Sequence, residues 1–388
     1  MLWSAGSNGH GQLANGSLID SHIFSPCSFL GCLPGTLPQN RKLVHLAFGA
    51  NHTLALLEST ERDGQKVTEL WGCGDGNAGQ LGPSFIGESI ATFRPLDLLL
   101  ERNGLAGYLP RLVCASWQTT YAVMSCPAMP DVLISIGAND FGDLGIGAIR
   151  AKPVRDFHIV GLEHFCAGAV AVALLAAGQH HVVVRLAGGP IVGWGTARHG
   201  QLGAVETPFL PSPAVLTPAR ADVIHAALGH QHTVFLHAAG TVSGLGSNRK
   251  RQLHGIGNRT RARSVACTWN GTYITTDDGD LLSTGSNANG QLGHADSDDA
   301  VAFPFTAATH QLLHVACGSE HVLASFAAGP TTEVWGWGWN EHGNLGVGTT
   351  EDVRLPCKIW PPDSSQAQSG RVSIWAGLGT SWIAVQSH

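Results

Sequence analysis

The chain has 388 residues, with 50 glycines, only 13% charged residues and a formal net charge of −6. This balance excludes a protein that coats nucleic acid by electrostatics alone. No signal-peptide pattern opens the chain and no apolar run reaches the ~18–20 residues that span a bilayer. We therefore expect a cytoplasmic and nuclear protein built from short strands and turns.

The first recurring element is a short apolar strand followed by a turn of the form Gly-x-Asn-x-x-Gly-Gln-Leu-Gly. Its copies begin near residues 2, 70, 133, 191, 242, 281 and 334, which makes seven repeats of roughly fifty residues each. Gly and Asn accept positive φ at little cost, so their spacing predicts a tight turn. We expect the turn glutamine to bond neighbouring backbone and the leucine to enter the core. The polar residues with this structural role are Gln12, Gln80, Gln201, Gln252, Gln291 and Asn344.

In the second copy the turn residues 74–79 spell Gly-x-Gly-x-x-Gly, the fingerprint of dinucleotide-binding folds. That site needs a helix whose N-terminus meets the pyrophosphate and an acidic residue about twenty residues further on. No helical pattern follows here, and the other copies keep the turn without the three glycines. We therefore interpret the segment as a repeat turn and expect no cofactor of the protein's own.

A second motif alternates with the first and consists of a strand, a Gly-x-x-His turn and another strand. Its fullest form runs from Val44 to Leu56. At the histidine position the copies have His52, Thr119, His181, His232, Gly271, His321 and Thr380. An Asp-Gly hairpin signal at Asp278-Gly279 joins this motif to the next copy of the first, so their strands belong to one four-stranded sheet.

The first strand of the chain, Leu2–Ala5, has no hairpin partner unless it pairs with the last strand, Trp382–Gln386. Such pairing would close a ring and remove the open sheet edges that invite aggregation. The sequence therefore predicts an all-β fold, one seven-bladed β-propeller over residues 1–388 that is closed by strands from both ends. A short helix is expected at Arg94–Glu101, in one of the long connections.

The nine cysteines and twenty histidines are interpreted as structural. No Cys-x-x-Cys pair occurs, and Cys114, Cys166, Cys267 and Cys317 recur at one point of an apolar strand, which favours packing. The densest histidine clusters, at 180–181 and 230–232, lack further ligands at metal-binding spacing, so no metal site is predicted. We expect His52, His181, His232 and His321 to hydrogen-bond between neighbouring blades near the axis.

These paired motifs resemble the repeats of the regulator of chromosome condensation family over essentially the whole chain. The string Trp335–Gly338 with Glu341–Asn344, the ending Gly379–Ile383 and the tryptophan-bearing turns resemble its small single-propeller fungal members. For those, the resemblance implies a non-enzymatic subunit in a heterodimer with a small acidic metal-binding protein that carries zinc or iron. It also implies support for Elongator-dependent tRNA wobble-uridine modification and for diphthamide synthesis on elongation factor two.

The alternative implied by the same resemblance is a guanine-nucleotide exchange factor for a small GTPase. Family members with that activity use acidic and histidine side chains from the turns before the recurrent histidine. The corresponding residues of this chain are Asn51, Gln118, His180, Gln231, Asn270 and Glu320. Only Glu320 is acidic, which argues against exchange activity.

Three tryptophans are candidates for the surface that faces the partner. Trp117 and Trp269 both occupy the Ala50 position of their repeats, and Trp382 is the third. Exposed tryptophan is a common interface anchor, whereas the other interpretation is that Trp117 and Trp269 plug the channel or a gap between blades. Further candidates on the same face are Gln118, Asn270 and Glu320.

A basic run over residues 249–263 interrupts this acidic chain. It contains Arg249, Lys250, Arg251, Arg259, Arg261 and Arg263. One interpretation is a solvated loop, and another is electrostatic steering of an acidic partner. Direct contact with single-stranded RNA comes third, because stacking aromatic residues are not interleaved with these charges.

Overall fold

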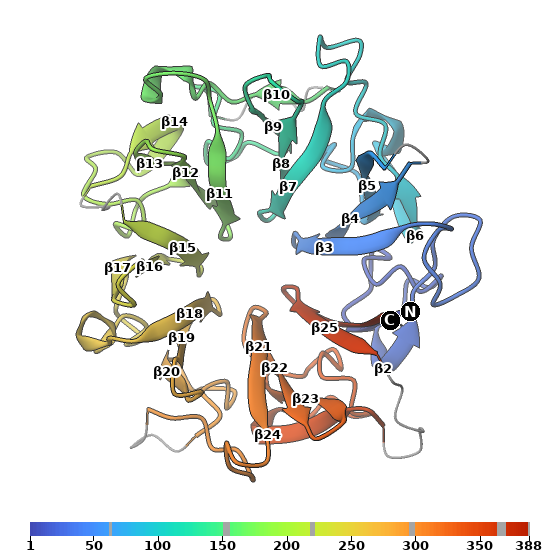
Figure 1. Ribbon diagram of the computed structural model, residues 1–388, viewed down its shortest axis with the longest axis vertical. Helices are drawn as coiled ribbons and strands as arrows, with labels where there is room; N and C mark the ends of the chain where they lie inside the picture. The colour runs from blue at the N-terminus through green and yellow to red at the C-terminus, as the bar shows by residue number, and fades with distance from the viewer. Residues whose placement is uncertain (62–63, 150–155, 218–221, 295–298, 363–369, 387–388) are drawn as a thin grey trace.

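The computed structural model is a ring of seven β-sheets, as the sequence predicts (Figure 1). It describes residues 1–388 except 62–63, 150–155, 218–221, 295–298, 363–369 and 387–388. Each sheet is one blade, and its strands run outward from the axis in the order in which the chain forms them. The blade that contains both ends of the chain is the one exception to that order.

The strands of each blade are given from the axis outward. The first blade has β25 (Arg371–Ala376), β26 (Thr380–Gln386), β1 (Leu2–Gly6) and β2 (Ser21–Pro26), and the second has β3 (Lys42–Phe48), β4 (His52–Thr60), β5 (Lys66–Asp75) and β6 (Ser89–Pro95). The third has β7 (Leu109–Ala115), β8 (Thr119–Ser125), β9 (Val132–Gly137) and β10 (His158–Ile159), and the fourth has β11 (Val172–Ala177), β12 (His181–Leu186), β13 (Ile191–Thr196) and β14 (Phe209–Val215). The fifth has β15 (Val223–Leu228), β16 (His232–His237) and β17 (Val242–Gly246), and the sixth has β18 (Ala262–Cys267), β19 (Gly271–Thr276) and β20 (Leu281–Gly285). The seventh has β21 (Gln311–Cys317), β22 (His321–Ala328), β23 (Thr331–Gly338) and β24 (Val353–Trp360).

The described parts of the fifth and sixth blades have three strands, so the expectation of four strands is wrong for these two. In the fifth, the short 3-10 helix η3 (Ile256–Asn258) follows β17. In the sixth, only an isolated bridge between Leu282 and Ala300 lies outside β20.

The ring is closed by strands from the two ends of the chain, as the sequence predicts. β1 pairs antiparallel with β26, in a register that runs from Leu2 opposite Ala384 to Gly6 opposite Thr380. The amino group of Met1 adds a hydrogen bond of 2.7 Å to the Val385 carbonyl oxygen. The marked ends lie side by side in Figure 1. Folding of the first blade therefore requires the first and last residues of the described chain to meet.

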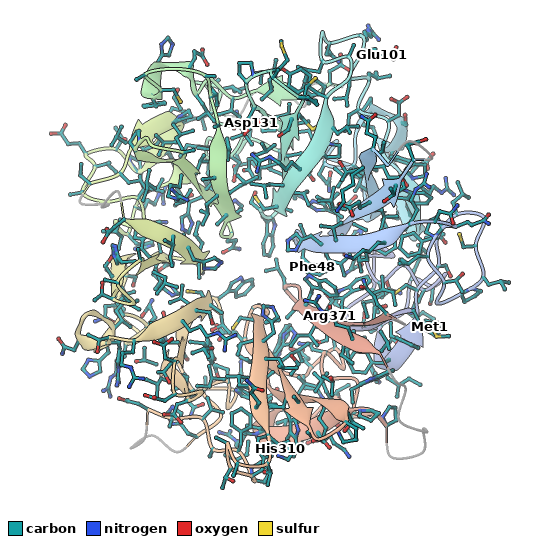
Figure 2. The ribbon with its side chains drawn as sticks, viewed as in Figure 1. Met1, Phe48, Glu101, Asp131, His310 and Arg371 are labelled. Carbon is teal, nitrogen blue, oxygen red and sulfur yellow. The ribbon has the colours of Figure 1, made fainter. Side chains whose placement is uncertain are left out.

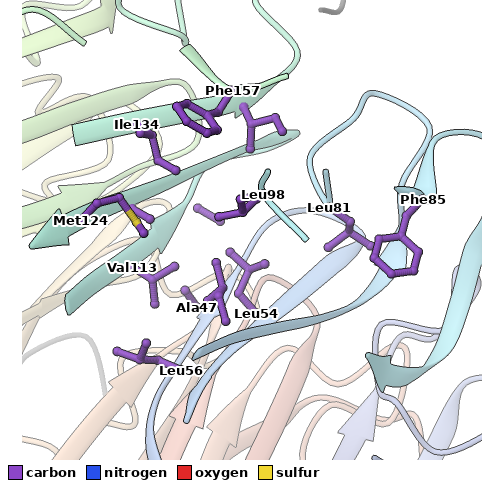
Figure 3. Close-up of a cluster of buried hydrophobic side chains, with 14 of the residues drawn as sticks. Ala47, Leu54, Leu56, Leu81, Phe85, Leu98, Val113, Met124, Ile134 and Phe157 are labelled. Carbon is purple, nitrogen blue, oxygen red and sulfur yellow. The ribbon is translucent and has the colours of Figure 1, made fainter. Parts of the chain in front are cut away.

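The core lies between blades, because each hydrophobic cluster takes side chains from two neighbouring sheets. Figure 3 shows one, in which Leu54 and Leu56 of the second blade face Val113 and Met124 of the third. Leu81, from a Gly-Gln-Leu-Gly turn, lies in the same cluster and is fully buried. The equivalent leucines of the other turns that are buried are Leu13, Leu144, Leu202, Leu292 and Leu345. The predicted role of the turn leucine is thus confirmed.

The short helix expected at Arg94–Glu101 is wrong. Arg94 pairs with Gly72 in the β5–β6 ladder, and the Leu96 amide continues that ladder by donating to the Leu70 carbonyl at 2.8 Å. Edge-strand pairing therefore outweighs the local helix preference. The other 3-10 helices are η1 (Pro83–Phe85) and η2 (Glu163–Phe165). Among the residues that the structure describes, no helix is long and apolar enough to cross a membrane.

Candidate functional site

One side of the ring carries the turns between the innermost and the second strand of every blade, and we call it the turn face. These turns are residues 49–51, 116–118, 178–180, 229–231, 268–270, 318–320 and 377–379. In the second blade the Asp75 amide, at the end of β5, donates a 2.7 Å hydrogen bond to the Asn51 carbonyl. Gly74 adopts φ +97°, and a Cβ there would clash with that carbonyl. The same bond recurs at Ser7–Gly379, Ala138–Gln118, Thr196–His180, Ser247–Gln231, Ser286–Asn270 and Trp339–Glu320. It brings the Gly-Gln-Leu turns to the turn face as well.

The recurrent histidines link neighbouring blades, as predicted. Nε2 of His52 lies 3.1 Å from the Thr120 hydroxyl, which in turn donates to the Gln80 carbonyl at 2.7 Å. Because the hydroxyl donates to the carbonyl, the imidazole Nε2–H donates to the hydroxyl. The equivalent contacts are His181–Thr233, His232–Thr272 and His321–Ser381, at 3.0–3.2 Å.

The turn glutamines bond backbone within their own turn, which confirms their predicted structural role. Oε1 of Gln80 accepts a hydrogen bond of 2.9 Å from the Ala78 amide. The same contact is made by Gln12, Gln201, Gln252 and Gln291. In the seventh blade Asn344 replaces glutamine, and its amide donates to the Trp339 carbonyl at 3.0 Å.

The buried histidines predict that stability falls in mild acid. Burial lowers the pKa of His52, His232 and His321 to about 4 and that of His181 to about 3. An unfolded histidine takes a proton near pH 6.5, so below that pH the unfolded state binds more protons than the folded one. The contribution of the neutral histidines to the free energy of unfolding is therefore fully present above pH 6.5. As the pH falls from there toward 4, the free energy of unfolding decreases by about 1.4 kcal/mol per pH unit for each histidine.

Equilibrium urea unfolding at pH 7.5, 6.5, 5.5 and 5.0 measures this slope. A His232→Thr variant places at this position the threonine that other copies have at Thr119 and Thr380. Its stability should change less with pH than that of the wild type, by about the contribution of one histidine, 1.4 kcal/mol per pH unit. An equal slope in the variant and the wild type would contradict the assignment.

Trp117 and Trp269 meet across the axis, although they belong to the third and sixth blades. Their ring centroids are 6.1 Å apart and their planes differ by 36°. Together with Phe48, which reaches inward from the end of β3 (Figure 2), they line a cavity of about 150 Å³ at the turn face. Both indoles are half-buried. The pair thus lies across the mouth of the channel, where one of the two interpretations places it, while part of each ring stays exposed.

Trp382 does not belong to this surface, so its assignment as a partner-facing residue is wrong. It is fully buried and packs against Phe48 and Phe93, with ring centroids 5.7 and 5.9 Å away. Its indole N–H donates to the Thr380 hydroxyl at 3.0 Å. Trp382 lies within β26, the second strand of the closing blade, where both sheet faces are covered.

Glu320, the one acidic residue of these turns, is held by the neighbouring sixth blade. Its two carboxylate oxygens accept hydrogen bonds of 2.6 Å from Asn270 and 2.7 Å from Gln291. Burial raises the pKa of Glu320, while these two hydrogen bonds and the charge of Lys250 act in the opposite direction. Gln118 lies half-buried on the same face. The structure therefore places Gln118, Asn270 and Glu320 at the turn face but joins only the last two.

The basic run does not form one patch. Arg249, Lys250 and Arg251 are exposed in the turn after β17, on the turn face. The next two arginines form ion pairs, Arg259 with Asp299 and Arg261 with Asp278. Arg263 lies exposed on β18, the innermost strand of its blade. Of this run, residues 249–251 therefore remain as the cationic part of the candidate partner-binding surface.

Sequence reasoning missed an aromatic strip that crosses the turn face, made of Phe209, Phe141, His180, Trp117, Trp269 and His230. Neighbouring rings along it have centroids 4.5–6.1 Å apart. Arg198 lies 4.9 Å from the centroid of Phe209 and adds a cation. The members come from four blades, so no local pattern joins them. Five of the six occupy variable positions of repeat turns, and Phe209 is the first residue of β14.

The structure supports packing roles for the cysteines. All nine are free, and burial raises the pKa of the Cys267 thiol to about 12. A thiol with such a pKa stays protonated at neutral pH and is a poor nucleophile and ligand. Within the described residues, no group of three or more His, Cys, Asp or Glu side chains is arranged to hold a metal ion.

Comparisons with known proteins give one family. The regulator of chromosome condensation (RCC1) repeat matches residues 1–56, 278–325 and 333–373, and a second model of the same repeat matches residues 262–291. The chain is 27% identical to the ultraviolet-B receptor UVR8 of Arabidopsis thaliana, over 84% of this chain and 72% of that protein. It is 26% identical to the secretion-regulating guanine nucleotide exchange factor of Mus musculus, over 100% of this chain and 84% of that protein. The solved structure of Prp20p from Saccharomyces cerevisiae has the same fold, with a TM-score of 0.75 at 19% identity, over 100% of this chain and 92% of that one.

Proposed function

Because this chain is a regulator of chromosome condensation repeat protein, we propose that it is a non-catalytic subunit that binds a small acidic metal-binding protein. The partner would carry the zinc or iron, and the two would form a heterodimer in the cytoplasm and nucleus. The proposal follows the resemblance to the fungal alpha-tubulin suppressor. On that resemblance, the heterodimer supports Elongator-dependent tRNA wobble-uridine modification and diphthamide synthesis on elongation factor two.

The observation that carries the proposal is the composition of the turn face. A chain with net charge −6 presents there an aromatic strip beside four exposed cations, Arg198 and residues 249–251. Half-buried aromatic rings give a partner large contact area at low entropic cost. Exposed cations beside them raise the association rate of an acidic protein. A binding surface of this kind needs no catalytic group.

Replacement of Trp117 or Trp269 by alanine is expected to weaken partner binding by about 2 kcal/mol or more, as for a central interface anchor. Affinity capture with the tagged full chain, followed by titration calorimetry with the recovered zinc- or iron-containing protein, measures this. Met129→Ala is the matched control, since Met129 is 57% exposed at the opposite end of the third blade. Partner affinity that equals the wild type in both tryptophan variants would contradict the assigned surface.

The second candidate function is guanine-nucleotide exchange, which the full-length similarity to the mouse exchange factor favours. Against it, the lone turn carboxylate of Glu320 is already engaged by Asn270 and Gln291. Capture of a GTPase that depends on the bound nucleotide, together with accelerated nucleotide release by the purified chain, would establish exchange in place of the first proposal.

A further inference from the structure

Gln201, in the Gly-Gln-Leu turn of the fourth blade, has a buried hydrogen-bond donor without an acceptor. Its Oε1 accepts a hydrogen bond of 2.9 Å from the His199 amide, like the other turn glutamines. The residue is 0% exposed, and its Nε2 has no hydrogen-bond partner. An unsatisfied buried donor costs about 1–3 kcal/mol of stability. A donor of this kind is therefore expected to have an acceptor when the protein is bound to its partner.

The equivalent glutamine two blades further on shows what is missing. Nε2 of Gln291 donates to a carboxylate oxygen of Glu320 at 2.7 Å, and Glu320 immediately precedes the recurrent histidine of the next blade. In the blade after Gln201 that same position is Gln231. The donor is therefore present at Gln201, whereas the carboxylate that its internal copy binds is absent.

Gln201 lines an open cleft of about 170 Å³ between the fourth and fifth blades. Its other walls include Phe141, His180, Arg198, His199, Phe209 and His230. The cleft adjoins Trp117 and Trp269, whose rings lie 6.1 Å from His180 and 5.8 Å from His230. Three imidazoles, one guanidinium and two phenyl rings thus surround a free amide donor.

The charges in the cleft suit a singly charged group. Asp143, the acidic residue beside it, is buried and already lies 3.0 Å from Nδ1 of His180. Burial and the neighbouring imidazoles lower the pKa of His230, so it is a neutral ring at pH 7. Arg198 is the permanent cation. One guanidinium with neutral N–H donors balances a carboxylate better than a phosphate dianion.

We infer that this cleft receives the carboxylate of an acidic side chain of the partner, whose oxygen accepts a hydrogen bond from Nε2 of Gln201. The inference rests on the proposed function, since it names what the acidic partner inserts beside the tryptophan pair. Phe141 and Phe209 would contact the aliphatic part of that side chain. The Gln291–Glu320 contact is the internal example of the same bond.

The test is to supply the missing carboxylate from within the chain. Gln231→Glu reproduces the position of Glu320, and Asn51→Glu adds the same charge to the equivalent turn of the second blade, away from the cleft. The probes are a fluorescein-labelled hexaglutamate peptide, a labelled hexaglutamine peptide and adenosine monophosphate. Fluorescence anisotropy and competition report binding to the full-length chain.

We expect hexaglutamate to bind the wild type and to lose at least about tenfold in affinity in Gln231→Glu, as for one charge-assisted hydrogen bond. Asn51→Glu should change it by no more than about threefold, and hexaglutamine should bind weakly to all three proteins. Equal losses in both variants would overturn the inference. The inference would also be overturned if adenosine monophosphate displaced hexaglutamate from the wild type and bound more tightly than hexaglutamate does.

The outcomes separate this inference from the proposed function. If the acidic metal-binding protein is captured equally by the wild type and Gln231→Glu, the proposed function stands and the cleft is not its docking point. If hexaglutamate binding depends on residue 231 but no such protein is captured, the carboxylate site stands and the identity of the partner is wrong.

Discussion

Replacement of Trp382 by alanine is expected to lower the free energy of unfolding by about 3–5 kcal/mol, because it removes a fully buried indole from the closing blade. The ring packs against Phe48 of the second blade and Phe93 of its outer strand. The cavity would lie where the first and last strands of the chain hold the propeller shut. Stability, rather than partner affinity, is therefore the property that the substitution changes.

Equilibrium urea unfolding measures the loss, and Trp339→Ala is the control. Trp339 is a half-buried tryptophan of the seventh blade that meets the His342 ring edge to face, with centroids 5.4 Å apart, so its removal should cost much less stability. At a temperature where both variants are folded, Trp382→Ala should bind the partner as the wild type does. A variant of wild-type stability that fails to bind would restore Trp382 to the partner-facing surface.

The architecture could be predicted because its signals are local and repeated. A positive-φ glycine equivalent to Gly74 recurs in all seven copies, and a buried turn leucine such as Leu81 recurs in six of them, so weak local signals add up to a strong one. Ring closure was predictable for a different reason, since β1 lacks a hairpin partner in the sequence and β26 is the remaining strand that can supply one.

The misplaced tryptophan shows how much depends on register within the repeat. Trp117 and Trp269 stand two residues before the recurrent position, at Thr119 and Gly271. Trp382 stands two residues after it, and is therefore a strand residue. A shift of four residues moves the side chain from the turn face to the core between blades.

The candidate site was harder to predict because its residues meet only in the folded ring. Arg259 and Arg261 look like part of one basic run until Asp299 and Asp278, distant in sequence, neutralise them. The aromatic strip is assembled from four blades, so the absence of aromatic residues next to the basic run in sequence said nothing about the surface. When two side chains come into contact only because the ring closes, the sequence of a single repeat does not predict that contact.

Glycine and histidine depend on each other in the second motif. The four copies with histidine have glycine three residues earlier, at Gly49, Gly178, Gly229 and Gly318. A Cβ on any of these would clash with the imidazole of its own motif or press closely against it. Where histidine is replaced by Thr119 or Gly271, the glycine is replaced as well, by Ser116 and Thr268. At Gly377 the imidazole is absent, but the Phe48 ring lies 2.9 Å from an added Cβ.

Gly49→Ser alone is therefore expected to lose about 3 kcal/mol or more, because the new Cβ would overlap the His52 ring. His52→Thr alone should lose about 1–3 kcal/mol with the Thr120 contact. The double variant recreates the Ser116–Thr119 pair and should lose less than the sum of the two, with a coupling of about 1–3 kcal/mol. Rescue stays partial because the Ser116 carbonyl oxygen lies 2.8 Å from the added Cβ.

Urea unfolding of the four proteins measures the cycle, and Gly9→Ser, whose Cβ meets no atom within 4 Å, is the control. Strictly additive losses would mean that the glycine is required by the neighbouring blade and not by its own histidine.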